Sequence, residues 1–378
     1  MTDTTMRDYQ SDPLVHTPSP DLPPPATSVG LIGWMRNNLF SSPMNSLFTV
    51  LGVAALYYII PPIVNWAFVD ATISGTTREG CDAAGGACWT FIKVRFWLFM
   101  YGFYPEGEWW RVNLSLLLFF GPLLYCLIET TPGKKWVVIF LCIPYWPIGG
   151  ALLLGGFWGM PFVDTTQWSG FSLTLIIAVT GISFSLPLGI LLALGRRSDL
   201  PVLRMICIGF IEFIRAVPLI SILFMSTVIL PLFMPEGVTF DKLMRALIGV
   251  TLFSAAYMAE TVRGGLQAIP NGQYEAADAM GLTYWQSMRL IVLPQALKIV
   301  IPALVSSFIG LFKDTTLVLI IGLVDLVSMI QSSGADIAWA GYAPHGYVFA
   351  ALLFFVFCFS MSRYSMYLED KLHTGHKR

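Results

Sequence analysis

Residues 170–195 read "GFSLTLIIAVTGISFSLPLGILLALG", an apolar run without a single charged side chain. A helix needs roughly 20 predominantly apolar residues to cross the hydrocarbon core of a bilayer. The whole chain of 378 residues is 56% hydrophobic and only 12% charged, whereas about 25% of the residues in a soluble domain are charged. The sequence therefore predicts an all-α integral membrane protein.

The same criterion of length and apolarity predicts eight membrane-spanning helices. They cover residues 45–66, 113–129, 136–156, 169–195, 205–233, 243–262, 299–323 and 345–366. Because the number of spans is even, both termini are expected on the same side of the membrane.

Basic residues collect on one side of this predicted topology. They are Arg36, Lys134, Lys135, Arg196, Arg197, Arg204, Arg263, Arg289, Lys298, Lys371, Lys377 and Arg378. The opposite connections at 157–168 and 324–344 contain no Lys or Arg, and the long loop at 67–112 balances its basic residues with acidic ones. Since cytoplasmic loops carry an excess of Lys and Arg, the basic side is predicted to be the cytoplasm.

Both ends of the chain are predicted to be short cytoplasmic tails. Residues 1–35 are polar and proline-rich, without the basic start and short apolar core of a cleaved signal peptide. We expect this tail to be disordered. Residues 367–378 form the second tail. Between them, residues 36–165 hold three spans and residues 166–366 hold the other five.

The loop at 67–112 contains two cysteines in "CDAAGGAC", namely Cys81 and Cys88. On the predicted topology this loop lies outside the cytoplasmic membrane, where disulfides persist, so a bond between the two is predicted. Closing a ring of this size contributes about 2.5 kcal/mol in the chain-entropy description. Two free thiols are the alternative, and a metal site is not expected because no His lies nearby.

The cytoplasmic connection at 264–298 is longer than a link between two helices requires. It contains "EAADAMGLTYWQSMRLIVLP", from Glu275 to Pro294, which is polar and helix-prone. Gly281 permits a turn, and Pro294 is expected to end a second helical run. The sequence predicts two short helices lying across the membrane surface.

This stretch resembles the EAA loop found in the membrane subunits of ABC importers. In that family the loop carries a coupling helix, which docks into a cleft of a cytoplasmic ATPase and transmits its closure to the spans. An ordinary amphipathic surface loop is the alternative. The residues that carry the resemblance are Glu275, Ala276, Ala277, Gly281, Ile291, Leu293 and Pro294.

Two further stretches resemble the polar amino-acid permease branch of this family. They are "GFSLTLIIAVTGISFSLPLGILLALGRRSDLPVLRMICIGFIEFIRAVPLISILF" from residue 170 and "PQALKIVIPALVSSFIGLFKDTTLVLIIG" from residue 294. The resemblance runs from about residue 165 to the C-terminus, and it implies a type I importer core made of the last five spans. Three additional N-terminal spans resemble the larger membrane subunit of uptake systems for general L-amino acids.

The resemblance implies a transport subunit and not an enzyme. No GxxxxGK[ST] phosphate-binding loop occurs, so ATP and Mg are expected on a separate ABC ATPase, present in two copies. The chain itself is expected to hold no cofactor or metal.

Further implied partners are a second permease subunit in a heterodimer, an extracytoplasmic amino-acid-binding protein and membrane lipid, but no nucleic acid. The implied location is the bacterial inner membrane. An ion-coupled secondary amino-acid transporter is the alternative, favoured by related halves and by helices broken at mid-membrane.

Charged residues inside the predicted spans need a partner or a cavity, because each costs about 2.5–3.5 kcal/mol at mid-bilayer. Glu212 and Arg215 lie three residues apart on one helix face, as do Glu260 and Arg263, so each pair can neutralise itself. A structural role and a gate role are both open. Pro218 is expected to kink the span just beyond the first pair.

Lys313 and Asp314 lie about midway along the span at 299–323 and point about 100° apart. The segment "KDTTL" resembles the KDTSL of the family, in which the Asp lies near the transported amino acid. This resemblance implies that Asp314 contacts the substrate ammonium and that Thr315 and Thr316 help to line the site. Pairing of Asp314 with a neighbouring helix is the alternative.

Overall fold

The computed structural model describes residues 30–128, 130–157, 159–235 and 240–372. Within this part of the chain, six helices are long and apolar enough to cross a membrane, and two further pairs pass the same test as bent spans. The all-α membrane fold is therefore confirmed, and the eight predicted spans are matched when each bent pair counts as one. The predictions for most of the two tails lie outside the described residues.

The chain divides into two compact units, residues 1–70 and 71–378. In the first unit, α1 (Gly30–Asn38) precedes α2 (Pro43–Val64), which continues as a π-helical turn to Val69. No residue of α2 is buried within the described chain. The boundary between the compact units thus lies after the first span.

The second unit begins with two helices that precede its first spanning helix. They are α3 (Glu79–Ala84) and α4 (Trp89–Tyr101). The next helix, α5 (Trp109–Leu127), begins four residues before the predicted span at 113–129. The region predicted as a loop at 67–112 is therefore largely helical, because α4 buries apolar side chains against the core helices.

The predicted span at 136–156 consists of α6 (Lys134–Cys142) and α7 (Tyr145–Leu154). The two helices meet at 49°. Pro144 lies at the junction, and because its ring nitrogen has no hydrogen, it cannot bond to a carbonyl one turn back. The span is bent there for that reason.

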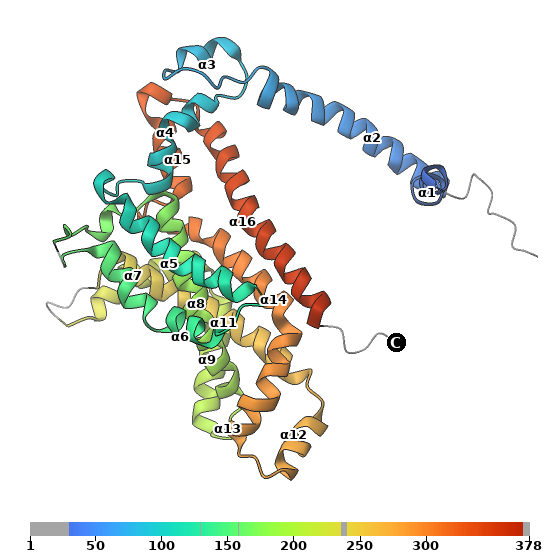
Figure 1. Cartoon of the computed structure of the whole chain (residues 1–378), viewed down its shortest axis with the longest axis vertical. Helices are drawn as coiled ribbons and strands as arrows, with labels where there is room; N and C mark the ends of the chain where they lie inside the picture. Colours follow the sequence, from blue (N-terminus) through green and yellow to red (C-terminus); the bar gives the residue numbers. More distant parts are fainter. Residues whose placement is uncertain (1–29, 129, 158, 236–239, 373–378) are drawn as a thin grey trace, which may run out of the picture. The chain divides into compact units, whose positions relative to one another are not determined.

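The last five spans form the core of the second unit, with the connections between them (Figure 1). Its helices are α8 (Gly170–Arg196), α9 (Pro201–Ala216), α10 (Leu219–Phe224), α11 (Lys242–Gln267), α12 (Asn271–Ala279), α13 (Tyr284–Ser287), α14 (Leu293–Asp314), α15 (Leu326–Ala335) and α16 (Ala343–Leu372). Short 3₁₀ and π turns lie between the helices of the second unit, at Glu106–Glu108, Thr165–Gln167, Met225–Ile229, Leu230–Phe233, Met288–Val292, Thr315–Ile321 and Ile337–Trp339.

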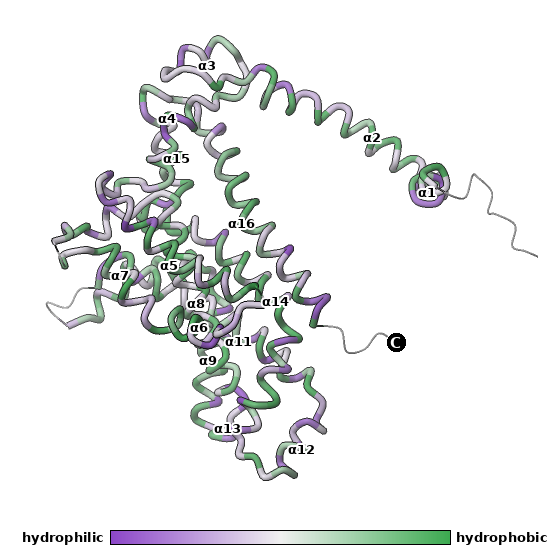
Figure 2. The backbone as a smooth tube through the Cα atoms, in the orientation of Figure 1, coloured by the Kyte–Doolittle hydropathy of each residue, from purple (hydrophilic) through white to green (hydrophobic). Residues whose placement is uncertain are grey.

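Close packing of α8 on α11 makes the centre of this core. Gly189 of α8 allows the approach, because a Cβ added there would lie 2.5 Å from the Cβ of Met258 and 3.0 Å from the backbone nitrogen of Ala259. Small residues let membrane helices approach closely in this way. Figure 2 shows that apolar residues predominate along the spanning helices, whereas polar residues interrupt the chain around α12.

The span predicted at 205–233 is not one straight helix. The helix α9 and the segment Leu219–Phe233 meet at 107°. Pro218 lies at the break, so the predicted position of the kink is confirmed, but the bend is sharp enough to separate two helices. The missing N–H of Pro218 and its restriction of the preceding residue to an extended conformation explain the break.

The prediction that Pro294 ends a helix is wrong. The chain is helical from Tyr284 to Ile321 through α13, a π turn and α14, and Pro294 lies in the first turn of α14. The proline stands two residues after the π turn Met288–Val292, where the regular hydrogen-bond pattern of an α-helix is already interrupted. The second half of the predicted surface connection is therefore continuous with the seventh span.

Candidate coupling and translocation sites

The turn after α12 has a defined hydrogen-bond geometry. The N–H of Gly281 donates to the carbonyl of Asp278 at 2.9 Å, and the N–H of Leu282 donates to the carbonyl of Ala277 at 3.2 Å. Gly281 has a φ of +72°. This pattern is a Schellman motif, which satisfies the last carbonyls of a helix and favours glycine at the left-handed position. Gly281 therefore determines where α12 ends.

The following helix begins with an equally specific cap. The side chain of Gln286 accepts a hydrogen bond from the backbone N–H of Thr283 at 2.9 Å, and the Thr283 side chain accepts one in return. Such a capping box satisfies two unpaired donors at the start of a helix. The two helices thus meet at a turn that is defined on both sides. We call this segment, residues 271–287, the coupling turn.

Three core helices hold the coupling turn in place. Arg197, just beyond α8, donates to the hydroxyl of Tyr274 at 3.0 Å and to the carbonyl of Leu266 at 3.1 Å. Its guanidinium also lies over the Tyr274 ring. On the other side, Gln295 donates to the side chain of Gln273 at 3.0 Å. These hydrogen bonds join the coupling turn to the end of α8, to α11 and to α14.

The predicted residues of the coupling turn differ in exposure. Glu275, Ala276 and Gly281 are exposed, whereas Ala277 is fully buried. Of the rest, Pro294 is exposed, and Ile291 and Leu293 are partly buried along the continuous helix.

Sequence reasoning missed two large apolar side chains at the coupling turn. Met280 is 76% exposed and Trp285 is 66% exposed. The sequence feature that could have identified these two residues is their position in a polar segment outside the predicted spans. Exposed apolar groups beside a rigid turn are typical of a protein–protein contact. We call the end of the bundle where this turn lies the coupling end, and the other the far end (Figure 1).

A cluster of five charged residues lies close to the coupling end. Glu260 is its centre, with carboxylate oxygens 2.7 Å from Arg196, 2.8 Å from Arg263 and 3.6 Å from Arg215. Arg196 also contacts Glu212 at 2.9 Å. Three helices, α8, α9 and α11, are joined by these contacts.

The pairing within this cluster corrects one prediction. The Glu260–Arg263 pair is present, but in the described structure Glu212 pairs with Arg196 and Arg215 pairs with Glu260. The carboxylate of Glu260 is mostly buried, so it attracts several guanidinium groups from neighbouring helices more strongly than the exposed Glu212 does. Contacts between helices have replaced one contact within a helix.

The predicted substrate contacts lie where α14 becomes a 3₁₀ helix. Asp314 is the last residue of α14, and in the described chain neither it nor Lys313 has a hydrogen-bond or ion-pair partner on its side chain. The alternative of Asp314 paired with a neighbouring helix is therefore not seen. An unpaired charge within a span requires a cavity or a ligand.

The two threonines face different surroundings. Thr315 is fully buried, and its hydroxyl donates to the carbonyl of Phe312 at 2.8 Å, so it does not line an open site in this conformation. Thr316 and Lys313 border a cavity of about 500 Å³ between α14, α15 and α16, which also contacts Tyr347. Because Asp314 lies about 100° from Lys313 on the helix, it faces another side.

At the far end, Cys81 and Cys88 form a disulfide with Cα atoms 5.4 Å apart. The neighbouring Asp82 accepts hydrogen bonds from the Tyr342 hydroxyl at 2.6 Å and from Arg78 at 3.0 Å. These two bonds, that from Tyr342 first, lower the pKa of Asp82 from its ordinary value. A second link joins Arg95 to Asp336. The disulfide-closed segment is thus fastened to the connection between α15 and α16.

Comparison with known protein families assigns this architecture to one of them. Residues 185–374 match the family described as the inner membrane component of binding-protein-dependent transport systems. This chain belongs to that family. The matched region of this inner membrane component includes the coupling turn, all five residues of the charge cluster, and Asp314.

Two relatives match nearly the whole chain. The inner membrane amino-acid ABC transporter permease protein YhdY of Escherichia coli is 54% identical over 90% of this chain and 93% of that protein. The glutamate/glutamine/aspartate/asparagine transport system permease protein BztC of Rhodobacter capsulatus is 42% identical over 94% of this chain and 96% of that protein.

A shorter relative matches about half of this inner membrane component. The probable glutamine ABC transporter permease protein GlnP of Bacillus subtilis is 35% identical over 53% of this chain and 91% of that protein. The remaining part of the chain is thus shared with the two long relatives and has no counterpart in the aligned part of GlnP.

Proposed function

We propose that this chain is the membrane-spanning permease subunit of an ATP-driven amino-acid importer that works by alternating access. The observation that carries the proposal is the coupling turn, which exposes Met280, Gly281 and Trp285 while three core helices hold it. A surface fixed in this way can receive a force from a partner and pass it to the spans. The names of the two long relatives support amino acids as the substrate class.

A separate ABC ATPase, in two copies, is the partner proposed for the coupling turn. Closure of the ATPase on ATP and Mg would displace α12, and Arg197 would transmit that displacement to the end of α8. Arg196, the next residue, contacts Glu260 and Glu212, so the movement would reach α11 and the bent span at α9. This contact sequence supports a gate role for the charge cluster.

For the translocated amino acid, the unpaired carboxylate of Asp314 is the proposed partner of the α-ammonium group. A charge-assisted hydrogen bond of this kind offsets the cost of keeping an ionised carboxylate within a span. Thr316 is proposed to contribute its hydroxyl, whereas Thr315 would do so only after a rearrangement that exposes it.

The remaining partners follow from the same proposal. A second permease subunit would complete the translocation path, and an extracytoplasmic amino-acid-binding protein would deliver substrate at the far end. The coupling end would then face the cytoplasm of a bacterium, with both termini inside. The excess of Lys and Arg near that end supports this orientation.

The alternative of an ion-coupled secondary transporter is not retained. The break at Pro218 is a feature that such transporters share. However, the two relatives that match nearly the whole chain are transport permeases of ABC and related systems, and none of the comparisons favours ion coupling.

Affinity purification from native membranes, followed by mass spectrometry, tests the proposal. An ABC ATPase is expected to copurify with the wild-type chain and to be lost when Glu275 or Gly281 is changed. Uptake should continue on ATP after the proton gradient has been collapsed. Recovery of the chain alone in a form that still transports would contradict the proposal.

A further inference from the structure

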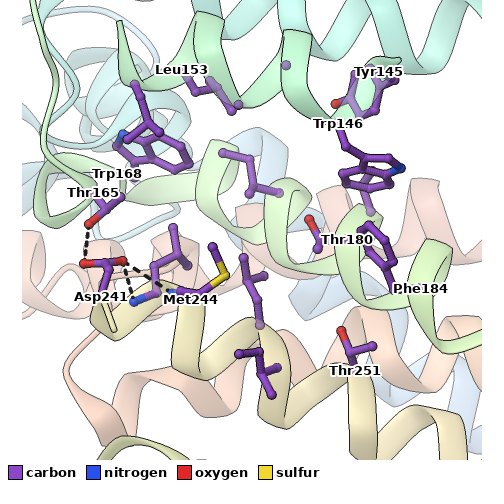
Figure 3. Close-up of a pocket in the computed structure, with 18 of the residues that line it drawn as sticks. Tyr145, Trp146, Leu153, Thr165, Trp168, Thr180, Phe184, Asp241, Met244 and Thr251 are labelled. Atoms are coloured by element: carbon purple, nitrogen blue, oxygen red, sulfur yellow. Dashed lines mark hydrogen bonds between the residues drawn. The ribbon is translucent and has the colours of Figure 1, made fainter. Parts of the chain in front are cut away.

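A half-enclosed cavity of about 640 Å³ lies between α7, α8 and α11 (Figure 3). Its walls are apolar along most of their length. Leu247 is one of the apolar side chains that α11 contributes. Trp146 and Phe184 line it on opposite walls, and their rings are 4.5 Å apart. The cavity therefore separates the additional N-terminal helices from the core over part of their length.

The length of the cavity matches one leaflet of a bilayer. Its lining runs from Tyr145 to Leu154 on α7, from Leu243 to Leu252 on α11 and from Ile176 to Leu188 on α8. These stretches cover nine, nine and twelve helical steps, or about 14–18 Å at 1.5 Å per residue. The hydrocarbon core of a bilayer is about 30 Å thick, so that one leaflet is about 15 Å.

Polar groups gather at the far end of this cavity. There the carboxylate of Asp241 accepts hydrogen bonds from the Thr165 hydroxyl at 2.7 Å and from the N–H of Leu243 at 2.9 Å (Figure 3). Asp241 remains exposed despite these bonds. The cavity is thus apolar inside and has an exposed carboxylate at its far end, where the spanning helix α11 begins.

Neither water nor empty space suits such a cavity. Water in a buried site needs several polar partners, which these apolar walls do not offer. An empty volume of this size would deprive the lining side chains of dispersion contacts. An apolar group from the surrounding membrane supplies those contacts without crossing any polar barrier.

We propose that the cavity holds one acyl chain of a phospholipid from the leaflet at the far end. The cavity is about as long as one leaflet is thick, which indicates an acyl chain as its occupant. The carboxylate of Asp241 indicates which type of headgroup lies beside it. A headgroup that carries a primary ammonium, as in phosphatidylethanolamine, places a positive charge beside Asp241. The net negative headgroup of phosphatidylglycerol is disfavoured there by like-charge repulsion.

Gly150 offers a variant that fills the cavity without disturbing its walls. Gly150 lines the cavity, and a Cβ added to it meets no atom within 4 Å. Phenylalanine at this position, G150F, occupies the space intended for the lipid and also favours the helix more than glycine does. Gly52 in α2 is the matched control, because a Cβ added there also meets no atom within 4 Å.

Native mass spectrometry of the full chain, with whichever subunits stay bound, measures the lipid directly. The wild-type chain and G52F are expected to retain one phospholipid each, and G150F is expected to lose it. Equal phospholipid retention by G150F and the wild type would overturn the proposal. So would a wild-type chain that carries only detergent at this stage.

The headgroup preference has a test of its own. Asp241→Asn removes the charge but keeps an N-cap for α11, because the amide oxygen of Asn also accepts backbone N–H groups. After reconstitution in vesicles of phosphatidylethanolamine and phosphatidylglycerol, the wild type should retain the former in excess over its share of the vesicle. In D241N that excess should disappear. An unchanged excess in D241N would overturn the headgroup assignment, independently of any transport activity.

Discussion

Arg196 lies 2.7 Å from Glu260, and the next residue, Arg197, lies 3.0 Å from the hydroxyl of Tyr274 in the coupling turn. Two consecutive arginines at the end of α8 therefore connect the surface proposed for the ATPase with the charge cluster of the spans. Each of these contacts is made by a side chain that belongs to the coupling turn or to the end of a core helix. On the proposed function, this link would let the surface helix α12 act on the bent span that contains Glu212.

Removing the central carboxylate should weaken the helix bundle. In Glu260→Gln, three guanidinium groups lose a shared partner that is only 16% exposed. An exposed ion pair contributes about 1 kcal/mol or less, whereas breaking a buried pair costs roughly 3–5 kcal/mol. The unfolding free energy of Glu260→Gln should fall by an amount between these two values. Thermal unfolding in detergent measures it. Glu212→Gln is the control, and an equal loss in that variant would contradict the central role of Glu260.

The space around Gly281 should prove essential to transport. A Cβ at Gly281 meets no atom of this chain within 4 Å, and Asn adopts a positive φ with little strain, so Gly281→Asn should leave the subunit folded. Transport should nevertheless be abolished, as in Gly281→Asp, because the added atoms occupy the space proposed for the ATPase. Uptake assays and membrane quantification measure the two effects.

Gly133 supplies the control for this experiment. It has a φ of +73° and equally open surroundings, but it lies outside the coupling turn. Gly133→Asn should retain transport. If both variants transport normally, close approach of the ATPase at Gly281 is excluded, whereas equal failure of both would point to backbone strain.

The carboxylate of Asp314 should matter for substrate affinity. Asp314→Asn replaces a charge-assisted hydrogen bond, worth about 1.5–3 kcal/mol, with a neutral one. Because the neutral bond still contributes about 0.5–1.5 kcal/mol, the net loss is about 1–1.5 kcal/mol, and the apparent affinity for the amino acid should fall by about five- to tenfold. Concentration-dependent uptake by the assembled complex measures this change. Thr316→Ser, which keeps the hydroxyl, should transport normally, and an unaltered affinity in Asp314→Asn would remove the proposed contact.

The far-end contact between Asp82 and Tyr342 should weaken in acid. Hydrogen bonds from Tyr342 and Arg78 lower the pKa of Asp82 below its ordinary value of 3.8 in the folded protein. The stabilisation is therefore complete above that value and is lost as the pH falls through the lowered pKa. Hydrogen exchange of residues 336–342 should increase in that range. Asp82→Asn should lack this acid-dependent step, and its persistence would exclude Asp82 as the source.

The disulfide predicts a specific labelling pattern. Alkylation of the denatured, non-reduced protein should modify four cysteines and leave Cys81 and Cys88 unmodified. Prior reduction should raise the number of modified cysteines to six. Intact mass measurement distinguishes the two results. Labelling of all six without reductant would show that the bond is absent from the purified protein.

Local features of the sequence determined much of this structure. The spans follow from the length of their apolar runs, because a bilayer leaves a backbone little alternative to a helix. The turn at Gly281 follows from the one residue type that adopts a positive φ without strain. The break near Pro218 follows from a missing N–H. Each of these depends on neighbouring residues alone.

Contacts between distant residues were decided only by the tertiary structure. Glu212 pairs with Arg196 instead of Arg215, and Thr315 turns into the core although its neighbour Thr316 borders a cavity. The cavity beside Gly150 likewise depends on how far α7 stands from α11. The physical reason is that periodicity places a side chain on a helix face, whereas its partner depends on which helix the packing brings against that face.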